Sequence, residues 1–272
     1  MIAGGCSFCA NWVADANIKK PELWGGYDHN TKRHIRFAWQ YIEPFRVWSE
    51  IVSQKFNMEL INTGRPGAGN DQIFHKLVDQ IFTHKNKIKL VVVMWSQIVR
   101  KDIQIEKERW ESTTFVLSKQ IERINFFRSM YEIGALNGIV CIDYFFRYSM
   151  ALTEICRTFD IKLVQCQGPS FFSDPNKLAE FQTANEKKQL YRNDKVDRKK
   201  LMKYFIDHIG FNYLEVQDDF IDWPIFKEIG GNTFKDIMNT NKNKFYLSKH
   251  DPHPNGAAHQ MYAEKIIDKI NE

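Results

Sequence analysis

The sequence predicts an α/β protein in which helices cover both faces of a central parallel sheet. Candidate strands alternate along the chain with segments of helical spacing, an order typical of parallel βαβ units. The strongest candidate strand, residues 88–95 (IKLVVVMW), is a continuous branched apolar run, as expected for a strand buried on both faces. No repeat, low-complexity tract or Pro/Gly/Ser-rich linker divides the chain, so we expect one domain over residues 1–272.

The N-terminal part of the chain contains two candidate strands and one helix. Residues 1–5 (MIAGG) form a short candidate strand, and residues 58–63 (MELINT) form a second. Between them, residues 43–57 carry apolar side chains along one side of a helix: Phe45, Trp48, Ile51, Val52 and Phe56.

A second helix is predicted just before the strongest strand. Over residues 71–84 (DQIFHKLVDQIFTH), apolar residues recur at helical spacing: Ile73, Leu77 and Ile81, with Phe74 and Val78 beside them. This helix would connect the second strand to the third, as a parallel sheet requires.

Two long helices and a fourth strand are predicted in the middle of the chain. The first helix covers about 110–136 and stops at the Asn-Gly pair 137–138. The second covers about 139–159. Residues 161–167 (IKLVQCQ) then form the fourth strand, which is closed by Gly-Pro-Ser.

The C-terminal part of the chain gives a clear signal at its end. Residues 174–247 show one helical segment, near 197–209, and the turn-like sequences DWP and GGN. The last helix is predicted to start near Asn255, whose side chain suits an N-cap. Its apolar stripe consists of Ala258, Tyr262, Ile266 and Ile270.

Charge and hydropathy argue against nucleic-acid and membrane-spanning classes. The net charge of +5 is spread along the chain, and the densest basic stretch, residues 194–205, is interleaved with acids, as on a solvated helix face. The longest apolar run, residues 90–95, is too short to span a bilayer. The N-terminus lacks a basic leader followed by a long apolar core, so no signal peptide is expected.

The five cysteines favour a reduced, cytoplasmic protein, because one must stay unpaired in a monomer. Cys6 and Cys9 have CxxC spacing, but no second CxxC or thioredoxin-like setting accompanies them. The other three cysteines lie in apolar stretches and are predicted to be core residues: Cys141, Cys156 and Cys166.

Four polar clusters are predicted to meet at one edge of the sheet. Residues 5–8 (GCSF), 64–71 (GRPGAGND) and 95–100 (WSQIVR) each follow a candidate strand. Because the carboxyl ends of parallel strands share an edge, these segments should lie together, where α/β proteins bind ligands. A fourth cluster, residues 250–255 (HDPHPN), precedes the last helix and supplies histidines from far away in sequence.

In order along the chain, these clusters resemble the motif blocks of the SGNH hydrolase family, the GDSL-like esterases. Residues 5–8 match the block that carries the serine nucleophile, with Cys6 where Asp is usual. Gly67, within PGAGN, matches the glycine of the oxyanion hole, and DPHPN matches the Asp-x-x-His block, which is often followed by Pro and Asn, at His253, Pro254 and Asn255. The resemblance implies a three-layer α/β/α sandwich with a central parallel, flavodoxin-like sheet and a family-variable insertion at about 174–247.

The resemblance also implies a role for each matching residue. Ser7 would be the nucleophile and His253 the base that removes its proton. Asp251 would orient the imidazole and stabilise its charged form. The oxyanion would receive hydrogen bonds from the Ser7 N–H, the Gly67 N–H and the side-chain amide of Asn70.

The match departs from the family pattern in two further blocks. Asp251 lies two residues before His253, where the pattern has three, and His250 occupies the usual acid position. The family's Gly-x-Asn-Asp block is replaced by MWSQIVR, so its oxyanion asparagine must be replaced by Asn70, by Gln97 or by nothing.

Several of these residues also have ordinary structural interpretations. Asn70 could be only the N-cap of a helix that begins at Asp71. Ser96 and Gln97 are expected to line the site, and Arg100 either binds a substrate anion or pairs with a nearby acid. The glycines Gly64, Gly67 and Gly69 could be turn residues.

The histidine-rich cluster could alternatively ligate a metal. Its candidate ligands are His250, Asp251, His253 and His259. No matching Cys or Glu cluster appears elsewhere, and a metal site would leave Ser7 without a role, so no metal is expected. For His259 we favour a packing role in the last helix.

The sequence therefore predicts a serine esterase that acts on a small ester without a cofactor. The family expectation includes an O-acetyl group on a carbohydrate as the substrate. Two alternatives stay open: an O-acyltransferase that uses the same site, and an inactive carbohydrate-binding or virion protein on the same fold. The protein would be cytoplasmic, because no signal peptide is expected, or virion-associated if it is phage-encoded. The opening Gly-Cys-Ser-Phe resembles that of related short proteins of marine bacteria and their phages.

Overall fold

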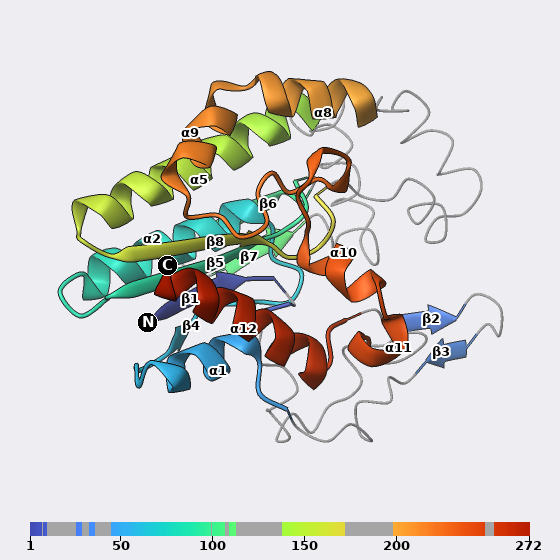
Figure 1. Cartoon of the computed structure of the whole chain (residues 1–272), viewed down its shortest axis with the longest axis horizontal. Coiled ribbons are helices and arrows are strands. Elements are labelled where there is room, and N and C mark those ends of the chain that lie inside the picture. The colour runs from blue at the N-terminus through green and yellow to red at the C-terminus, as the bar shows by residue number, and fades with distance from the viewer. Residues whose placement is uncertain are drawn as a thin grey trace.

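The centre of the molecule is a parallel sheet of four strands (Figure 1). The computed structural model describes residues 1–6, 8–9, 26–28, 33–35, 45–98, 100–106, 109–112, 138–171, 198–247 and 253–272. The strand order is β4 (Ile61–Asn62), β1 (Ile2–Gly5), β5 (Leu90–Trp95) and β8 (Lys162–Gln167), and every pairing is parallel. The predicted α/β class is confirmed, and each of the four strands falls within its predicted range.

The central strand β5 is apolar throughout because it faces a hydrophobic core on each side. Side chains alternate between the two faces of a strand. Val91, Val93 and Trp95 enter one core, whereas Leu90, Val92 and Met94 enter the other. All six residues are buried, which explains the continuous apolar run at 90–95.

The first core lies between the sheet and a layer of four helices: α2 (Asn70–His84), α5 (Gly138–Thr158), α8 (Arg198–Asp207) and α9 (Ile209–Gln217). In α2 the predicted residues Ile73, Leu77 and Ile81 are the ones that enter this core. The helices predicted at 71–84, 139–159 and 197–209 are thereby confirmed, with small shifts at their ends.

The second core lies on the opposite face, under α1 (Trp48–Lys55), α10 (Phe234–Asn239), α11 (Lys242–Phe245) and α12 (Gly256–Asn271) (Figure 1). Helix α1 is shorter than the predicted range 43–57. Helix α12 starts as predicted, because Asn255 is its N-cap and its side chain accepts a hydrogen bond from Ala258 N at 3.1 Å. Helices on both faces give the three-layer arrangement.

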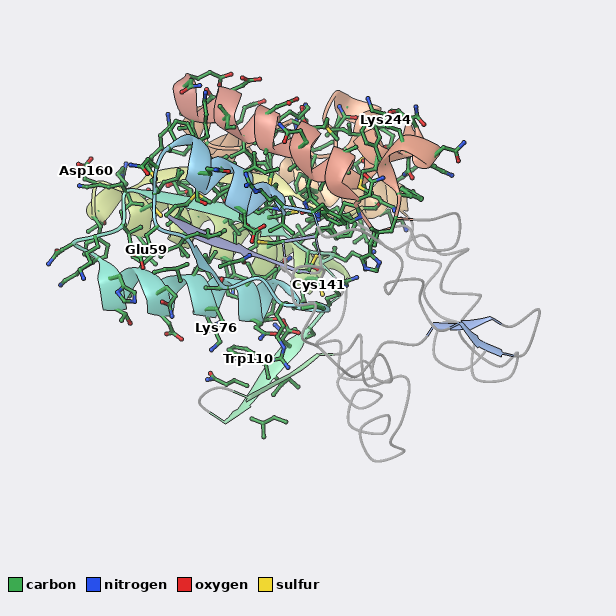
Figure 2. The ribbon with its side chains drawn as sticks, turned by 90° about the horizontal axis from the view of Figure 1, so that it is seen from below. Glu59, Lys76, Trp110, Cys141, Asp160 and Lys244 are labelled. Carbon is green, nitrogen blue, oxygen red and sulfur yellow. The ribbon has the colours of Figure 1, made fainter. Side chains whose placement is uncertain are left out.

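The helix predicted from about 110 is wrong at its start. Residues there form a hairpin of β6 (Asp102–Glu106) and β7 (Arg109–Ser112). The extended backbone places Trp110 against His75 of α2, with 5.5 Å between ring centroids, so that the indole is buried (Figure 2). The rest of the predicted helix, residues 113–137, lies outside the described residues.

The described part of the predicted insertion belongs to both cores. Phe220 forms a parallel bridge with Gln165 and extends the sheet beyond β8. The segment also contains a short 3₁₀ helix, Lys227–Ile229. Its buried residues divide between the two faces: Leu201, Phe205, Leu214, Phe220, Ile225 and Phe226 enter the first core, and Ile221, Phe234, Met238 and Phe245 enter the second. A further short hairpin is formed by β2 (Gly26–Asp28) and β3 (Arg33–Ile35).

Candidate functional site

The carboxyl ends of the parallel strands bring the polar segments to one edge of the sheet. Arg65 N donates to Gly5 O at 3.0 Å, which joins the loop after β4 to the end of β1. Gly168 N donates to Trp95 O at 3.0 Å, which joins the segment after β8 to the end of β5. In Figure 2, Glu59 and Asp160, which precede β4 and β8, lie toward one end of the sheet, and Cys141 lies toward the other.

Ser7 lies outside the described residues, but both of its neighbours are held firmly. Cys9 N donates to Cys6 O at 2.9 Å, and Phe8 and Cys9 form a turn. The indole Nε1 of Trp48 donates to Phe8 O at 3.0 Å, and Asn62 Nδ2 donates to Cys9 O at 3.0 Å. Two side chains from other elements therefore fix the backbone immediately after Ser7.

His253 lies beside the same turn. Its ring centroid is 6.0 Å from that of Phe8, and the two rings are tilted by 49°. The backbone of His253 and Pro254 is tied to the residues that follow α11, because Leu247 N donates to His253 O at 2.9 Å and Pro254 bridges Tyr246. His250 and Asp251 lie outside the described residues, so the acid assigned to Asp251 stays a prediction.

The loop between β4 and α2 carries Gly67 and Asn70. Gly67 is buried and has φ of 76°, a conformation that favours glycine. Asn70 is the first residue of α2, and the N-cap is Gly69. The N-cap alternative for Asn70 is therefore wrong. Its Oδ1 accepts from Ser96 N at 2.7 Å, and its Nδ2 lies 3.4 Å from Ser96 O.

The segment after β5 forms a second polar cluster at this edge. Ser96 is buried, and its side-chain oxygen accepts from Arg100 Nη1 at 3.2 Å. Arg100 Nε donates to Gln97 Oε1 at 3.2 Å. The expected lining residues are thus bonded to one another, and Ser96 connects them to Asn70.

Three residues at this edge were not predicted from the sequence. Trp48 and Asn62 fix the backbone of Phe8 and Cys9, and Gln167 Nε2 donates to Ser96 O at 2.9 Å. Asn62 and Gln167 both lie at the ends of predicted strands, where a polar residue could have indicated a site. Trp48 carries no such signal, because its segment reads as an ordinary amphipathic helix.

The histidine of the last helix has the packing role that was favoured for it. His259 is buried, and its Nδ1 accepts a hydrogen bond from Trp48 N at 3.3 Å. Burial lowers the pKa of His259 to about 3, so the ring is neutral near pH 7. A neutral ring is required because Nδ1 serves as the acceptor.

The cysteines of the CxxC sequence lie in the second core. Both are buried and unpaired, and Cys9 Sγ lies 3.5 Å from Asn62 Oδ1. Burial raises the pKa of the Cys9 thiol well above its usual range, and the nearby thiols of Cys6 and Cys166 act in the same direction. A reactive thiolate needs the opposite shift.

Two searches of the described ranges give negative results. Within them, no group of three His, Cys, Asp or Glu side chains is arranged to hold a metal ion. None of the helices described there combines the length and the apolar content that a membrane crossing needs.

No protein-family model matches the chain. No curated protein matches its sequence. Among solved structures, it is similar to a protein assigned to the lipolytic G-D-S-L family from Desulfitobacterium hafniense DCB-2, with 10% identity, a TM-score of 0.45 and coverage of 98% of this chain and 97% of the other.

Two further solved structures are similar over nearly the whole chain. One is the acetyl xylan esterase AlAXEase, with 12% identity, a TM-score of 0.43 and coverage of 99% and 98%. The other is LAE5, an alpha/beta hydrolase enzyme from the metagenome of Lake Arreo in Spain, with 12% identity, a TM-score of 0.46 and coverage of 99% and 94%. The fold of this chain is that of an α/β protein with a parallel sheet between two helical layers.

Proposed function

We propose that the protein is a serine esterase in which Ser7 is the nucleophile and His253 the general base. The observation that carries this proposal is the contact between Phe8 and His253, whose ring centroids are 6.0 Å apart. Phe8 directly follows Ser7 in the sequence, whereas His253 comes from the other end of the chain. A serine hydroxyl is a poor nucleophile unless such a base removes its proton.

The reaction would proceed by acyl transfer through the serine. His253 takes the Ser7 hydroxyl proton while Ser7 Oγ attacks the ester carbonyl carbon. The tetrahedral intermediate then collapses, the bond to the alcohol oxygen breaks, and His253 returns the proton to that oxygen. Water, deprotonated by His253, attacks the acyl-serine, and the carboxylic acid and free Ser7 are released.

The oxyanion of the tetrahedral intermediate needs fixed donors. We assign this role to the Ser7 N–H, the Gly67 N–H and the Asn70 side-chain amide. The assignment to Asn70 is supported by its hydrogen bonds to Ser96, which hold the buried amide in one orientation. A donor that is already oriented costs no reorganisation during the reaction.

Asp251 is the proposed orienting acid, and the proposed substrate is a small ester such as an O-acetyl group on a carbohydrate. A carboxylate near the second ring nitrogen of His253 would select the tautomer and stabilise the imidazolium that forms. No cofactor takes part in this reaction.

Hydrolysis of 4-nitrophenyl acetate by the purified protein tests the proposal. We expect Ser7→Ala and His253→Ala each to lower kcat by about a thousandfold or more, and Asp251→Asn to lower it strongly. His84→Ala, at the far end of α2, is the matched control and should leave kcat unchanged. Equal turnover by wild type and Ser7→Ala would contradict the proposal. A panel of acetylated sugars, with and without an added sugar acceptor, then separates hydrolysis from acyl transfer.

A further inference from the structure

Arg100 is connected to the loop between β4 and α2, the candidate oxyanion loop, in two ways: through Ser96 and directly at Gly69. Its Nη1 donates to Ser96 Oγ at 3.2 Å, and the backbone N–H of Ser96 holds Asn70 Oδ1 at 2.7 Å. Its carbonyl oxygen lies so close to Gly69 that a Cβ at that position would be 2.3 Å from it. Ser96 therefore connects the Arg100 guanidinium to the side chain of Asn70.

The hydrogen bonds of Arg100 go to neutral groups. Its Nε donates to Gln97 Oε1 at 3.2 Å, and its Nη1 to Ser96 Oγ. Within the described ranges, Nη2 has no hydrogen-bond acceptor and no carboxylate pairs with the side chain. A half-buried guanidinium ordinarily pairs with an anion, because burial of an uncompensated charge is unfavourable.

Two carboxylates of the neighbouring segments, Asp71 and Asp102, are bound by other donors. Asp71 Oδ1 accepts from Lys101 Nζ and from the Tyr148 hydroxyl, the latter at 2.7 Å. Asp102 Oδ2 accepts from the backbone N–H groups of Gly69 at 2.7 Å and Gln72 at 3.2 Å. Lys101, the neighbouring cation, also lies 3.8 Å from the centroid of the Tyr144 ring.

Arg100 also lines a small pocket at this edge of the sheet. Asn70 lines the same pocket, so Arg100 and the residue that carries the proposed oxyanion donor border one small space. The other lining residues come from α2, the segment after β5 and α5: Asp71, Ile98, Lys101, Cys141, Tyr144, Phe145 and Tyr148. Cys141 is labelled at this end of the molecule in Figure 2.

We propose that Arg100 is a specificity-determining residue that binds a carboxylate on the ester substrate, so that the natural substrate is an anionic ester. The inference rests on the proposed esterase function of the same edge. Arg100 is bonded to Gln97 and Ser96 through Nε and Nη1, so Nη2 is the nitrogen that would form charge-assisted hydrogen bonds to the carboxylate. Its bonds to Ser96 and Gln97 hold the planar group in place before substrate arrives.

Two matched substrate pairs test the inference, one for each side of the ester bond. The first pair is 4-acetoxybenzoate and 4-acetoxybenzamide, which differ in the charge of the alcohol part. The second is mono-4-nitrophenyl glutarate and 4-nitrophenyl valerate, which differ in the charge of the acyl part. In wild type we expect kcat/KM to favour the anionic member of at least one pair by about 10- to 100-fold, the effect of one charge-assisted hydrogen bond.

Variants at Arg100 separate binding from structural support. Arg100→Gln should remove the preference for the anion, and Arg100→Lys should restore part of it because the charge returns without the planar fork. Arg157→Gln removes an exposed cation from the opposite end of α5. It should leave kcat/KM unchanged for both members of each substrate pair. An equal loss for both members of a pair in Arg100→Gln would show a structural role and overturn the inference.

A binding measurement keeps the inference independent of turnover. Calorimetric titration of the Ser7→Ala variant with 4-acetoxybenzoate and 4-acetoxybenzamide should show tighter binding of the anion, and this difference should vanish when Arg100→Gln is added. If anion binding depends on Arg100 but no ester is hydrolysed by wild type, the proposed function and the anionic ester substrate both fail, and only the assignment of Arg100 as an anion-binding residue stands. If esters are hydrolysed without any anionic preference, or the two ligands bind equally, the inference fails.

Discussion

The side chain of Asn70 is hydrogen-bonded to the backbone of Ser96, with Oδ1 accepting from Ser96 N at 2.7 Å and Nδ2 lying 3.4 Å from Ser96 O. Asn70 begins α2, after the loop that follows β4, and Ser96 directly follows β5. This pairing joins the candidate oxyanion loop to the centre of the sheet and leaves one Nδ2 proton for a ligand.

Substitution of Asn70 by Asp separates its two roles. Aspartate keeps an acceptor for Ser96 N and suits the first turn of α2, but its second oxygen faces Ser96 O, so we expect the protein to fold with a loss of about 1–3 kcal/mol. It lacks the Nδ2 donor, so we expect kcat for 4-nitrophenyl acetate to fall by about a hundredfold or more. Urea unfolding and steady-state kinetics measure the two effects. Asn70→Ala should lose both stability and turnover, and full activity in Asn70→Asp would exclude the amide as a donor.

Trp48→Phe tests whether the hydrogen bond from the indole to Phe8 O positions the backbone next to Ser7. Phenylalanine cannot donate to Phe8 O, which is 3.0 Å from the indole nitrogen. We expect kcat to fall at least tenfold with little change in KM, because the substitution acts on the position of the nucleophile rather than on substrate binding. Trp223→Phe is the control, since this indole packs among the phenylalanines of the first core. An equal loss of kcat in the control would indicate a general effect of core packing.

His259→Asn should change how stability depends on pH. Burial lowers the folded-state pKa of His259 to about 3, below its unfolded value of 6.5, so the unfolded chain binds more protons between these values. The neutral ring therefore contributes full stability above about pH 6.5 and loses it as the pH falls, by up to about 1.4 kcal/mol per pH unit. We expect the stability of wild type relative to His259→Asn to decline by about 2 kcal/mol between pH 6.5 and pH 5.

Asparagine is chosen at position 259 because its side-chain oxygen can still accept from Trp48 N. Other titrating groups act equally in both proteins and cancel in the difference. His84→Asn is the matched control. A constant difference across this pH range would show that His259 is accessible to protons in the folded protein.

Gln165→Leu should destabilise the fold strongly. Gln165 is buried on β8, where its Oε1 accepts from Trp95 Nε1 at 2.8 Å and from Ser149 Oγ at 2.7 Å, and its Nε2 donates to Asp219. Leucine would leave the Trp95 and Ser149 donors without their acceptor and would remove one donor from the Asp219 carboxylate. We expect this to cost about 3 kcal/mol or more. Urea unfolding measures the loss. The exposed Gln54→Leu should change stability by less than about 0.5 kcal/mol, and a similar small change at Gln165 would contradict the account.

Local sequence signals predicted the central fold well. The apolar run at 90–95 identified β5 because that strand is buried on both faces, and the spacing of Ile73, Leu77 and Ile81 identified α2 because those residues face one core. Asn255 identified the start of α12 because capping is a contact over three residues.

What the sequence did not predict depends on contacts between distant residues. Trp110 is extended because its indole packs on His75, 35 positions earlier. Trp48 and Asn62 hold the carbonyl groups of Phe8 and Cys9 across 40 and 53 positions. Helix α10 did carry a usable local signal, since Thr233 and Asp236 form a capping box at its start.

The most direct test of the central claim is labelling with a fluorophosphonate probe, followed by mass spectrometry of the labelled peptide. This probe reacts covalently with an activated serine. We expect wild type to carry the label on Ser7, and both Ser7→Ala and His253→Ala to remain unlabelled while folded. A folded wild type that does not label, or a label on another serine, would contradict the assignment of Ser7 and His253 as nucleophile and base.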